Sequence, residues 1–294
     1  MMDINYLNKM NKDKIKIAFD NMWDPWYLED FISPILKKYF DVTYDQNHPD
    51  VLFHSIFNKM TNTPKYKCKK ILILAENWRP SKFGPDYSIS FDPHSKTNFR
   101  LPIWQFFLLL NPKLKDRLFE KRKVENFERF CAFTVSNPSN QLRINHFELL
   151  SSYKKIHSYG KVKMNSLELK RLSEGKYWRD AKEEFFLSHN HKFMMAYENT
   201  SYPGYCTEKL MDAFLSGAIP IYWGDTIIEE DWNINAFVNV MKDTSWLNTI
   251  RTLDENKMMF EKMYSEPVFT LEQKEKLLNN LENFEKWLVE KVKF

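Results

Sequence analysis

The segment 197–209 concentrates residue types that can bind an anion. It follows an apolar run at 193–197 and leads into a helix-period run in which Thr207 is the expected N-cap. The amino end of such a helix directs backbone N–H groups and a partial positive charge toward a phosphate. Lys209 lies in the first helical turn, where the helix dipole disfavours a cation unless an anion lies beside it. The pattern indicates an anion-binding helix start, and an ordinary N-capped helix with a Glu-Lys surface pair is the alternative.

Two further polar residues are expected at the same edge of a parallel sheet. Glu208 offers acceptor oxygens that suit the paired hydroxyls of a ribose. Arg143 follows an apolar run at 133–135 and a polar turn, so we expect it near the start of the next helix. A guanidinium there can bind phosphate through two parallel donors. An ordinary surface arginine is the alternative for Arg143.

Glu76, in the N-terminal half, is a candidate general base. It follows the apolar run 71–75, and a carboxylate at the carboxyl end of a buried strand lies where an incoming hydroxyl would lose its proton. Asn77 and Arg79 follow it and could orient it or keep it ionised. The alternative is a glutamate that only accepts hydrogen bonds from backbone amides of the next loop.

Two indoles flank a carboxylate after the first apolar run, at 15–19. Trp23, Asp24 and Trp26 should therefore lie at the mouth of the N-terminal sheet. Flat aromatic rings stack well on the apolar faces of sugars. We expect these residues to bind an acceptor, and a loop anchored in the core by tryptophan is the alternative.

Common cofactor and metal motifs are missing from the sequence. The six glycines form neither a Gly-x-Gly-x-x-Gly nor a P-loop pattern, and no Asp-x-Asp occurs. His189 and His191 lack a nearby third ligand, and the three cysteines lie far apart. We expect no metal site and no tightly bound cofactor, with a divalent cation at most stimulating activity. Arginine, lysine and a helix terminus would instead neutralise a diphosphate.

Short apolar runs alternate with helix-period stretches, which favours an α/β fold with parallel sheets covered on both faces. The expected strands are Ile15–Phe19, Val51–Phe53, Ile71–Ala75, Phe133–Val135, Phe193–Tyr197 and Ile219–Trp223. The expected helices are Leu28–Tyr39, Asn145–Tyr153 and Thr207–Leu215. Gly217 is expected to end the last of these helices.

The length of 294 residues suggests two domains. The polar stretch 111–128 is the expected linker, which divides the chain into residues 1–124 and 125–294. The second domain would include a terminal amphipathic helix, opened by a capping box of Thr270 and Gln273. We expect the apolar face of that helix to pack on its own domain, with a membrane surface as the alternative. The apolar positions are Leu277, Leu281, Phe284, Leu288 and Val292.

Composition and charge exclude several classes of protein. The chain has 43 basic and 39 acidic residues, a balance that does not fit a nucleic-acid-binding surface. The sequence shows neither the apolar core of a signal peptide nor an apolar stretch of about 18 residues. We expect a cytoplasmic protein without a transmembrane segment, at most in weak peripheral contact with the inner membrane.

The motifs around the candidate anion site resemble those of the α-1,3-fucosyltransferases of glycosyltransferase family ten, the bacterial members above all. The match runs through Tyr197-Glu-Asn-Thr, Tyr205-Cys-Thr-Glu-Lys-Leu-Met-Asp-Ala-Phe and Ile219-Pro-Ile-Tyr-Trp-Gly. Supporting matches are Ala75-Glu-Asn, Ser90-Phe-Asp, Arg100-Leu-Pro, and Val135-Ser-Asn-Pro with Arg143. The resemblance spans about residues 76–239.

This resemblance implies a GT-B fold, in which two Rossmann-like domains face each other across a cleft. The N-terminal domain would bind the acceptor and the C-terminal domain GDP-fucose. The residues that match the family's donor site are Arg143, Asn199, Tyr205, Glu208 and Lys209. Arg143 and Lys209 would hold the pyrophosphate, and Glu208, at the catalytic centre, the ribose. Glu76 matches the proposed general base.

The implied reaction is an inverting transfer of L-fucose to a galactosyl-N-acetylglucosamine-type glycan, with α-1,3 linkage expected over α-1,4. Lewis-type products on bacterial protein or lipopolysaccharide would result. Another deoxy-sugar nucleotide as donor, or a catalytically inactive nucleotide-sugar or glycan binder, are the alternatives. The chain departs from its bacterial relatives at Ser158-Tyr159-Gly160, where they carry a glycine-rich turn.

Overall fold

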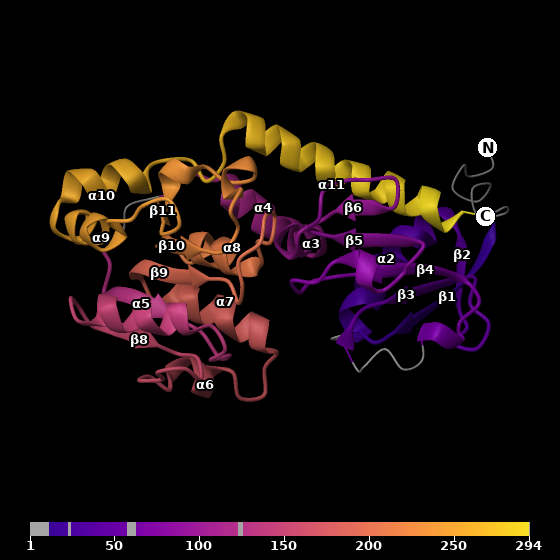
Figure 1. Cartoon of the computed structure of the whole chain (residues 1–294), viewed down its shortest axis with the longest axis horizontal. Helices are drawn as coiled ribbons and strands as arrows, with labels where there is room; N and C mark the ends of the chain where they lie inside the picture. Colours follow the sequence, from indigo (N-terminus) through magenta and orange to yellow (C-terminus); the bar gives the residue numbers. More distant parts are fainter. Residues whose placement is uncertain (1–11, 23–24, 58–62, 123–125, 294) are drawn as a thin grey trace, which may run out of the picture. The chain divides into compact units, whose positions relative to one another are not determined.

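The computed structural model describes residues 12–22, 25–57, 63–122 and 126–293 (Figure 1). The chain forms two compact units: Met1–Leu110 together with Leu278–Phe294, and Asn111–Leu277. The described residues of each unit form one sheet, and the strand pairs in both sheets are parallel. The expected α/β class with parallel sheets is confirmed.

The sheet of the first unit has the order β2-β1-β3-β4-β5-β6. Its strands are β1 (Lys14–Asp20), β2 (Asp41–Tyr44), β3 (Val51–His54), β4 (Lys69–Ile73), β5 (Tyr87–Ser90) and β6 (Asn98–Arg100). Helix α2 (Pro25–Tyr39) connects β1 to β2, and α3 (Ile103–Leu110) follows β6. Every residue of β3 is buried, as expected for a central strand of a parallel sheet covered on both faces.

The sheet of the second unit has the order β11-β10-β9-β7-β8. Its strands are β7 (Arg129–Phe133), β8 (Ile156–Ser158), β9 (His191–Tyr197), β10 (Ile219–Trp223) and β11 (Val238–Asn239). The helices between and after them are α5 (Gln141–Ser151), α6 (Glu168–Leu172), α7 (Trp178–Ser188), α8 (Glu208–Leu215), α9 (Trp246–Glu255) and α10 (Lys257–Tyr264). The predicted order of strand, loop, helix and strand over 193–223 is confirmed by β9, α8 and β10.

The strand order reverses direction once in the second sheet, between β7 and β9. The chain leaves β7 toward β8 on one side and later enters β9 on the other side. The chain therefore leaves β7 and β9 toward opposite sides of the sheet, which makes the carboxyl ends of these two strands its topological switch point. Open α/β sheets bind ligands at such a switch point.

The expected linker 111–128 contains a helix, α4 (Pro112–Phe119). Asn111 caps it by accepting from the backbone N–H of Lys113 at 3.2 Å. Its buried residues Leu114 and Leu118 lie four apart, so even this charged stretch has one apolar face. Helix α4 belongs to the second unit, which begins at Asn111 rather than at the predicted residue 125.

The terminal helix α11 (Leu271–Val292) begins at the predicted capping box, where Thr270 and Gln273 exchange backbone-to-side-chain hydrogen bonds of 2.8 and 3.2 Å. The five predicted apolar positions are all buried. Phe284 stacks on Phe31 with ring centroids 5.6 Å apart and meets Phe99 at 5.3 Å. This apolar face is covered by protein and is not a membrane-facing surface.

From Leu278 onward α11 belongs to the first unit, whereas the sequence assigned it to the C-terminal domain (Figure 1). Polar contacts support the same placement, since Lys38 pairs with Glu285 at 2.7 Å and Asn280 donates to the carbonyl of Arg100 at 2.9 Å. The 3.6-residue period defines an apolar face but does not identify what covers it. Among the described helices, none combines the length and the apolar character needed to cross a bilayer.

Candidate active site

The loops that follow β7 and β9 are joined by the side chain of Asn140. Its amide donates to the carbonyl of Asn199 at 3.2 Å and more weakly to that of Glu198 at 3.4 Å. Its carbonyl oxygen caps α5 by accepting from the backbone N–H of Leu142 at 3.0 Å. One residue thus fixes the start of α5 against the end of β9, at the switch point of the sheet.

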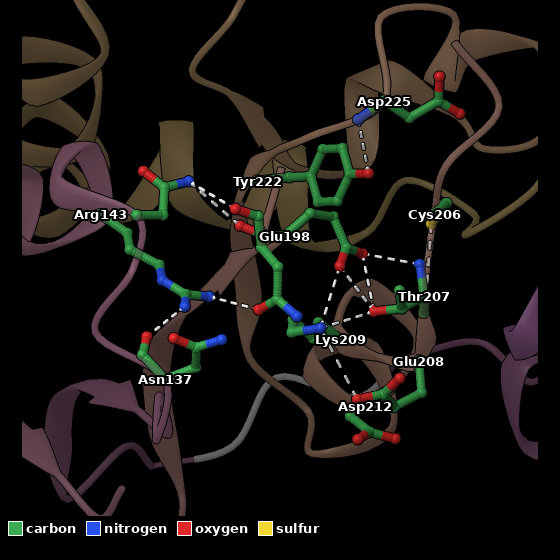
Figure 2. Close-up of polar contacts among 12 residues, drawn as sticks. Asn137, Arg143, Glu198, Cys206, Thr207, Glu208, Lys209, Asp212, Tyr222 and Asp225 are labelled. Carbon is green, nitrogen blue, oxygen red and sulfur yellow. Dashed lines mark hydrogen bonds and ion pairs between the residues drawn. The ribbon is translucent and has the colours of Figure 1, made fainter. Parts of the chain in front are cut away.

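Arg143 lies in the first turn of α5 and is 1% exposed (Figure 2). Its guanidinium donates to Oδ1 of Asn199 at 2.9 Å and to the backbone carbonyl of Asn137, and its Nε has no hydrogen-bond partner among the described residues. Burial lowers the pKa of Arg143, and the charge of Glu198 opposes this shift. No carboxylate within the described ranges forms an ion pair with it.

An arginine in this state favours an anion. A buried cation loses its hydration and needs a counter-charge, which two neutral oxygen acceptors do not supply. Arg143 is therefore not the surface arginine of the alternative interpretation. Its burial at the carboxyl ends of β7 and β9 makes it a candidate group for binding an anion.

Glu198, the residue after β9, is completely buried. It accepts from the backbone N–H of Thr207 at 2.7 Å, from the Thr207 hydroxyl at 2.7 Å and from Nζ of Lys209 at 3.0 Å (Figure 2). Burial raises the pKa of Glu198, and the ammonium of Lys209 opposes that rise. Glu198 was not among the predicted site residues, although its position directly after a buried strand was a signal in the sequence.

Thr207 occupies the N-cap position of α8 as predicted, but its side chain does not cap the helix. Its hydroxyl bonds to Glu198 instead, and Nζ of Lys209 donates to the same hydroxyl oxygen at 2.8 Å. The Thr207 side chain therefore does not accept hydrogen bonds from the first backbone N–H groups of α8. Lys209 is anchored beside these amides, which brings a cation to the positive end of the helix dipole.

Glu208 begins α8, with its carboxylate 3.9 Å from Nζ of Lys209. Burial alone would raise its pKa, but the charges of Lys209, Lys182 and Arg179 outweigh burial and lower the pKa to about 2. Glu208 is therefore an ionised acceptor at neutral pH. Lys182 and Arg179 come from α7, and they also pair with Asp212 at 2.7 and 3.2 Å.

Tyr205 lies in the turn between β9 and α8 and is 1% exposed. The turn depends on Gly204, whose φ of +80° is disfavoured for residues with a Cβ. The backbone N–H of Gly204 donates to Oδ1 of Asp225 at 2.6 Å. The structure therefore brings together, within the second unit, all five residues predicted for the donor site.

In the first unit, Glu76 lies three residues beyond β4 at the carboxyl edge, as predicted, and is partly buried. Its carbonyl accepts from the backbone N–H of Trp78 at 2.7 Å. Arg79 donates to Oδ1 of Asn77 at 2.6 Å and also pairs with Asp92. Arg79 therefore links Asn77, the residue after Glu76, to Asp92 beyond β5.

The predicted acceptor residues fall largely outside the described part of the chain. Trp23 and Asp24 lie outside it, and Trp26 belongs to α2 without a described side chain. His189 and His191, weighed as metal ligands, hydrogen-bond to the carbonyl of Phe185 and the hydroxyl of Tyr159. The described residues contain no group of three or more side chains suited to hold a metal ion.

The fold and the site define a class. Two parallel α/β units, with a buried arginine and a lysine-bearing helix start at one switch point, are the features of a GT-B glycosyltransferase. The model of glycosyltransferase family 10 (fucosyltransferase), C-terminal part, matches residues 124–280, and that of the α-(1,3)-fucosyltransferase FucT N-terminal domain matches residues 17–107. The chain belongs to glycosyltransferase family 10.

Curated relatives agree with this assignment. The chain is 28% identical to the α-(1,3)-fucosyltransferase FucT of Helicobacter pylori, over 91% of this chain and 63% of the relative. It is 30% identical to a putative fucosyltransferase of Acanthamoeba polyphaga mimivirus, over 48% of this chain and 24% of the relative. The chain therefore spans less than two thirds of the length of these proteins.

Among solved structures, the crystal structure of an α1,3-fucosyltransferase matches with a TM-score of 0.71 and 24% identity. The match covers 95% of this chain and 92% of that one. A crystal structure of α1,3-fucosyltransferase with GDP-fucose matches with a TM-score of 0.68. At this identity the likeness establishes the fold, which is GT-B as expected.

Proposed function

We propose that the protein transfers L-fucose from GDP-fucose to a glycan hydroxyl. The observation that carries this proposal is the buried guanidinium of Arg143, which has no ion-pair partner among the described residues. Membership of a fucosyltransferase family and the GDP-fucose named for a structural neighbour narrow the anion to a guanosine diphosphate sugar.

Each donor-site residue has a distinct proposed role. Arg143 and Lys209 hold the diphosphate and stabilise the negative charge that develops as the sugar leaves. Glu208, ionised at neutral pH, accepts hydrogen bonds from the ribose hydroxyls. Asn199 orients Arg143, and buried Tyr205 supports the turn that precedes α8.

The proposed reaction is a single displacement that inverts the anomeric centre. The acceptor oxygen attacks the anomeric carbon from the side opposite the diphosphate, the bond to the diphosphate oxygen breaks, and Glu76 takes the proton of the acceptor hydroxyl. Positioned base catalysis of this kind contributes about 10²–10⁴-fold in rate. The location of Glu76 at the carboxyl edge of the first sheet supports this role.

The proposed acceptor is a galactosyl-N-acetylglucosamine-type glycan, joined through an α-1,3 linkage. A bovine relative, 31% identical over 35% of this chain, is named 4-galactosyl-N-acetylglucosaminide 3-α-L-fucosyltransferase 9. Lewis-type products on bacterial glycans would follow. Another deoxy-sugar nucleotide is the second candidate donor, since Arg143 and Lys209 recognise the diphosphate rather than the sugar.

The direct test is incubation with GDP-fucose and N-acetyllactosamine, following GDP release and determining the product linkage by NMR. We expect release that depends on acceptor. A thermal-shift series with GDP, UDP and dTDP identifies the nucleotide, since a ligand of the folded state stabilises it by mass action. Stabilisation by dTDP or UDP alone would exclude GDP-fucose, and GDP binding without turnover would indicate an inactive binder.

A further inference from the structure

Trp78 is an exposed indole in the same turn as Glu76. It is 46% exposed, and its backbone N–H donates to the carbonyl of Glu76 at 2.7 Å. Two exposed tyrosines of this unit form hydrogen bonds through their hydroxyls: Tyr39 donates to Glu285 at 2.8 Å, and Tyr44 bonds to Ser33 at 2.6 Å. Trp78 combines large apolar exposure with a place at the carboxyl edge of the sheet.

The turn that carries Trp78 is clamped on both sides. Arg79, the next residue, pairs with Asp92 beyond β5 and donates to Asn77 at 2.6 Å. The same guanidinium lies over the ring of Phe91, 4.2 Å from its centroid. A residue on a turn fixed by a neighbouring strand loses little conformational freedom when it binds a ligand.

Lys82 ends the following 3-10 helix, η3 (Pro80–Lys82), and Phe83 is its C-cap; these two residues fix the indole itself. Phe83 meets the indole at 71° with ring centroids 6.2 Å apart. Nζ of Lys82 lies 4.9 Å from the centroid of the Trp78 ring. The result is a supported aromatic ring that is partly exposed and carries an ammonium donor over one face.

We infer that Trp78 is a stacking platform for a neutral pyranose of the acceptor glycan, with Lys82 donating to its hydroxyls. A pyranose offers an apolar C–H face and a rim of hydroxyls, which match an indole face and an adjacent ammonium. Because the platform shares a turn with Glu76, it would hold the sugar that carries the reacting hydroxyl or its neighbour. This inference rests on the proposed function.

The test compares steady-state kinetics of the wild type with Trp78→Ala, Trp78→Phe and Trp178→Ala. Trp178 is the matched control, an indole with 45% exposure at the start of α7 in the other unit. We expect Trp78→Ala to raise the KM for N-acetyllactosamine about tenfold, with kcat and the KM for GDP-fucose within about twofold. Trp78→Phe should recover most of the loss, and Trp178→Ala should match the wild type.

An unchanged acceptor KM in Trp78→Ala, or an equal change in Trp178→Ala, would overturn the inference while leaving fucosyl transfer intact. A wild type that transfers no fucose would instead sink the proposed function. The platform is then tested without a donor, by saturation-transfer NMR of N-acetyllactosamine. Sugar signals present with the wild type and lost with Trp78→Ala would support it, and any other pattern would refute it.

Discussion

Gly224 packs directly against the side chain of Glu198: a Cβ built on the glycine would lie 2.8 Å from Cβ of Glu198 and 2.9 Å from the hydroxyl oxygen of Tyr222. Both distances are closer than real Cβ contacts, so any side chain at this position displaces a neighbour. The absence of a side chain at Gly224 is therefore what allows Glu198 to stay buried while it holds Thr207 and Lys209.

Gly224→Ala should move Glu198 and loosen the start of α8. We expect GDP affinity to fall at least about tenfold and stability by roughly 1–3 kcal/mol from overpacking. Calorimetry and urea unfolding measure the two effects. Gly175→Ala is the control, since it forces a φ of +74° but meets nothing within 4 Å. Gly175→Ala should lower stability without changing GDP affinity. Equal GDP affinity in the two variants would contradict the role of Gly224.

Arg143→Met should separate ligand binding from stability. Loss of a charge-assisted contact to phosphate should weaken GDP binding about tenfold to a hundredfold. The donor-free protein should unfold at the same or a higher temperature, because replacing a buried charge with an apolar side chain of similar size is often neutral or stabilising. Isothermal calorimetry and thermal unfolding check both points, and full GDP affinity would remove Arg143 from the site.

Arg122 provides the contrast, because among the described residues this largely buried arginine hydrogen-bonds to backbone carbonyls. Burial lowers its pKa to about 10. Its acceptors, at 3.3–3.5 Å, are the carbonyls of Ala218, Ala236, Met263 and Glu266. Arg122→Met should leave those carbonyls unpaired and destabilise the second unit while GDP affinity stays unchanged.

Glu76→Gln should abolish proton transfer without disturbing the donor. We expect a loss of kcat of about 10²–10⁴-fold, with GDP affinity within error of the wild type. Quenched-flow or steady-state assays with GDP-fucose measure the first, and calorimetry the second. An active Glu76→Gln enzyme would show that another group, or solvent, accepts the proton.

The first unit should lose stability in mild acid through His54. Burial lowers its pKa to about 4, partly offset by the Ser55 backbone and Asp20, and neither ring nitrogen has a well-formed hydrogen bond. As pH falls below about 6.5, His54 is protonated in the unfolded chain before it is protonated in the folded protein. The free energy of unfolding therefore decreases between about pH 6.5 and pH 4. The cost at pH 5 is about 2 kcal/mol.

His54→Leu should remove this pH dependence from urea unfolding of the first unit between pH 7 and pH 5. The exposed residue His48 is the control, and His48→Leu should leave the wild-type pH profile in place. A profile in His54→Leu as steep as that of the wild type would show that other groups cause the acid loss.

Phe284→Ala should destabilise the first unit selectively. The ring is completely buried against Phe31 and Phe99, so truncation should cost about 3–5 kcal/mol. Limited proteolysis should then cut residues 12–110 well before residues 111–277. Uniform cleavage of both units would argue against the placement of α11.

Local sequence patterns predicted much of the second unit because each feature depends on its immediate neighbours. The apolar runs gave β9 and β10, Thr207 marked the start of α8, and Gly217 its end, with a φ of +79°. Arg143 was correctly placed near the start of a helix, because a strand and a turn precede that helix in the sequence.

Features that depend on distant segments were not predictable in this way. The low pKa of Glu208 comes from its neighbour Lys209 and also from Lys182 and Arg179, which belong to a helix two elements earlier in the chain. The contact between Glu198 and Lys209 depends on the conformation of the turn between β9 and α8, which brings the start of α8 next to the end of β9. The α4 helix was hidden because its apolar face has only two residues, Leu114 and Leu118.

The return of α11 to the first unit sets an order for biosynthesis. Phe31 and Phe99 leave the ribosome early, yet their partner Phe284 follows only after residues 111–277 have been made. At about 5–20 residues per second this delay lasts roughly ten to thirty seconds. During that interval the nascent first unit presents an open aromatic face, which is a natural binding surface for a chaperone.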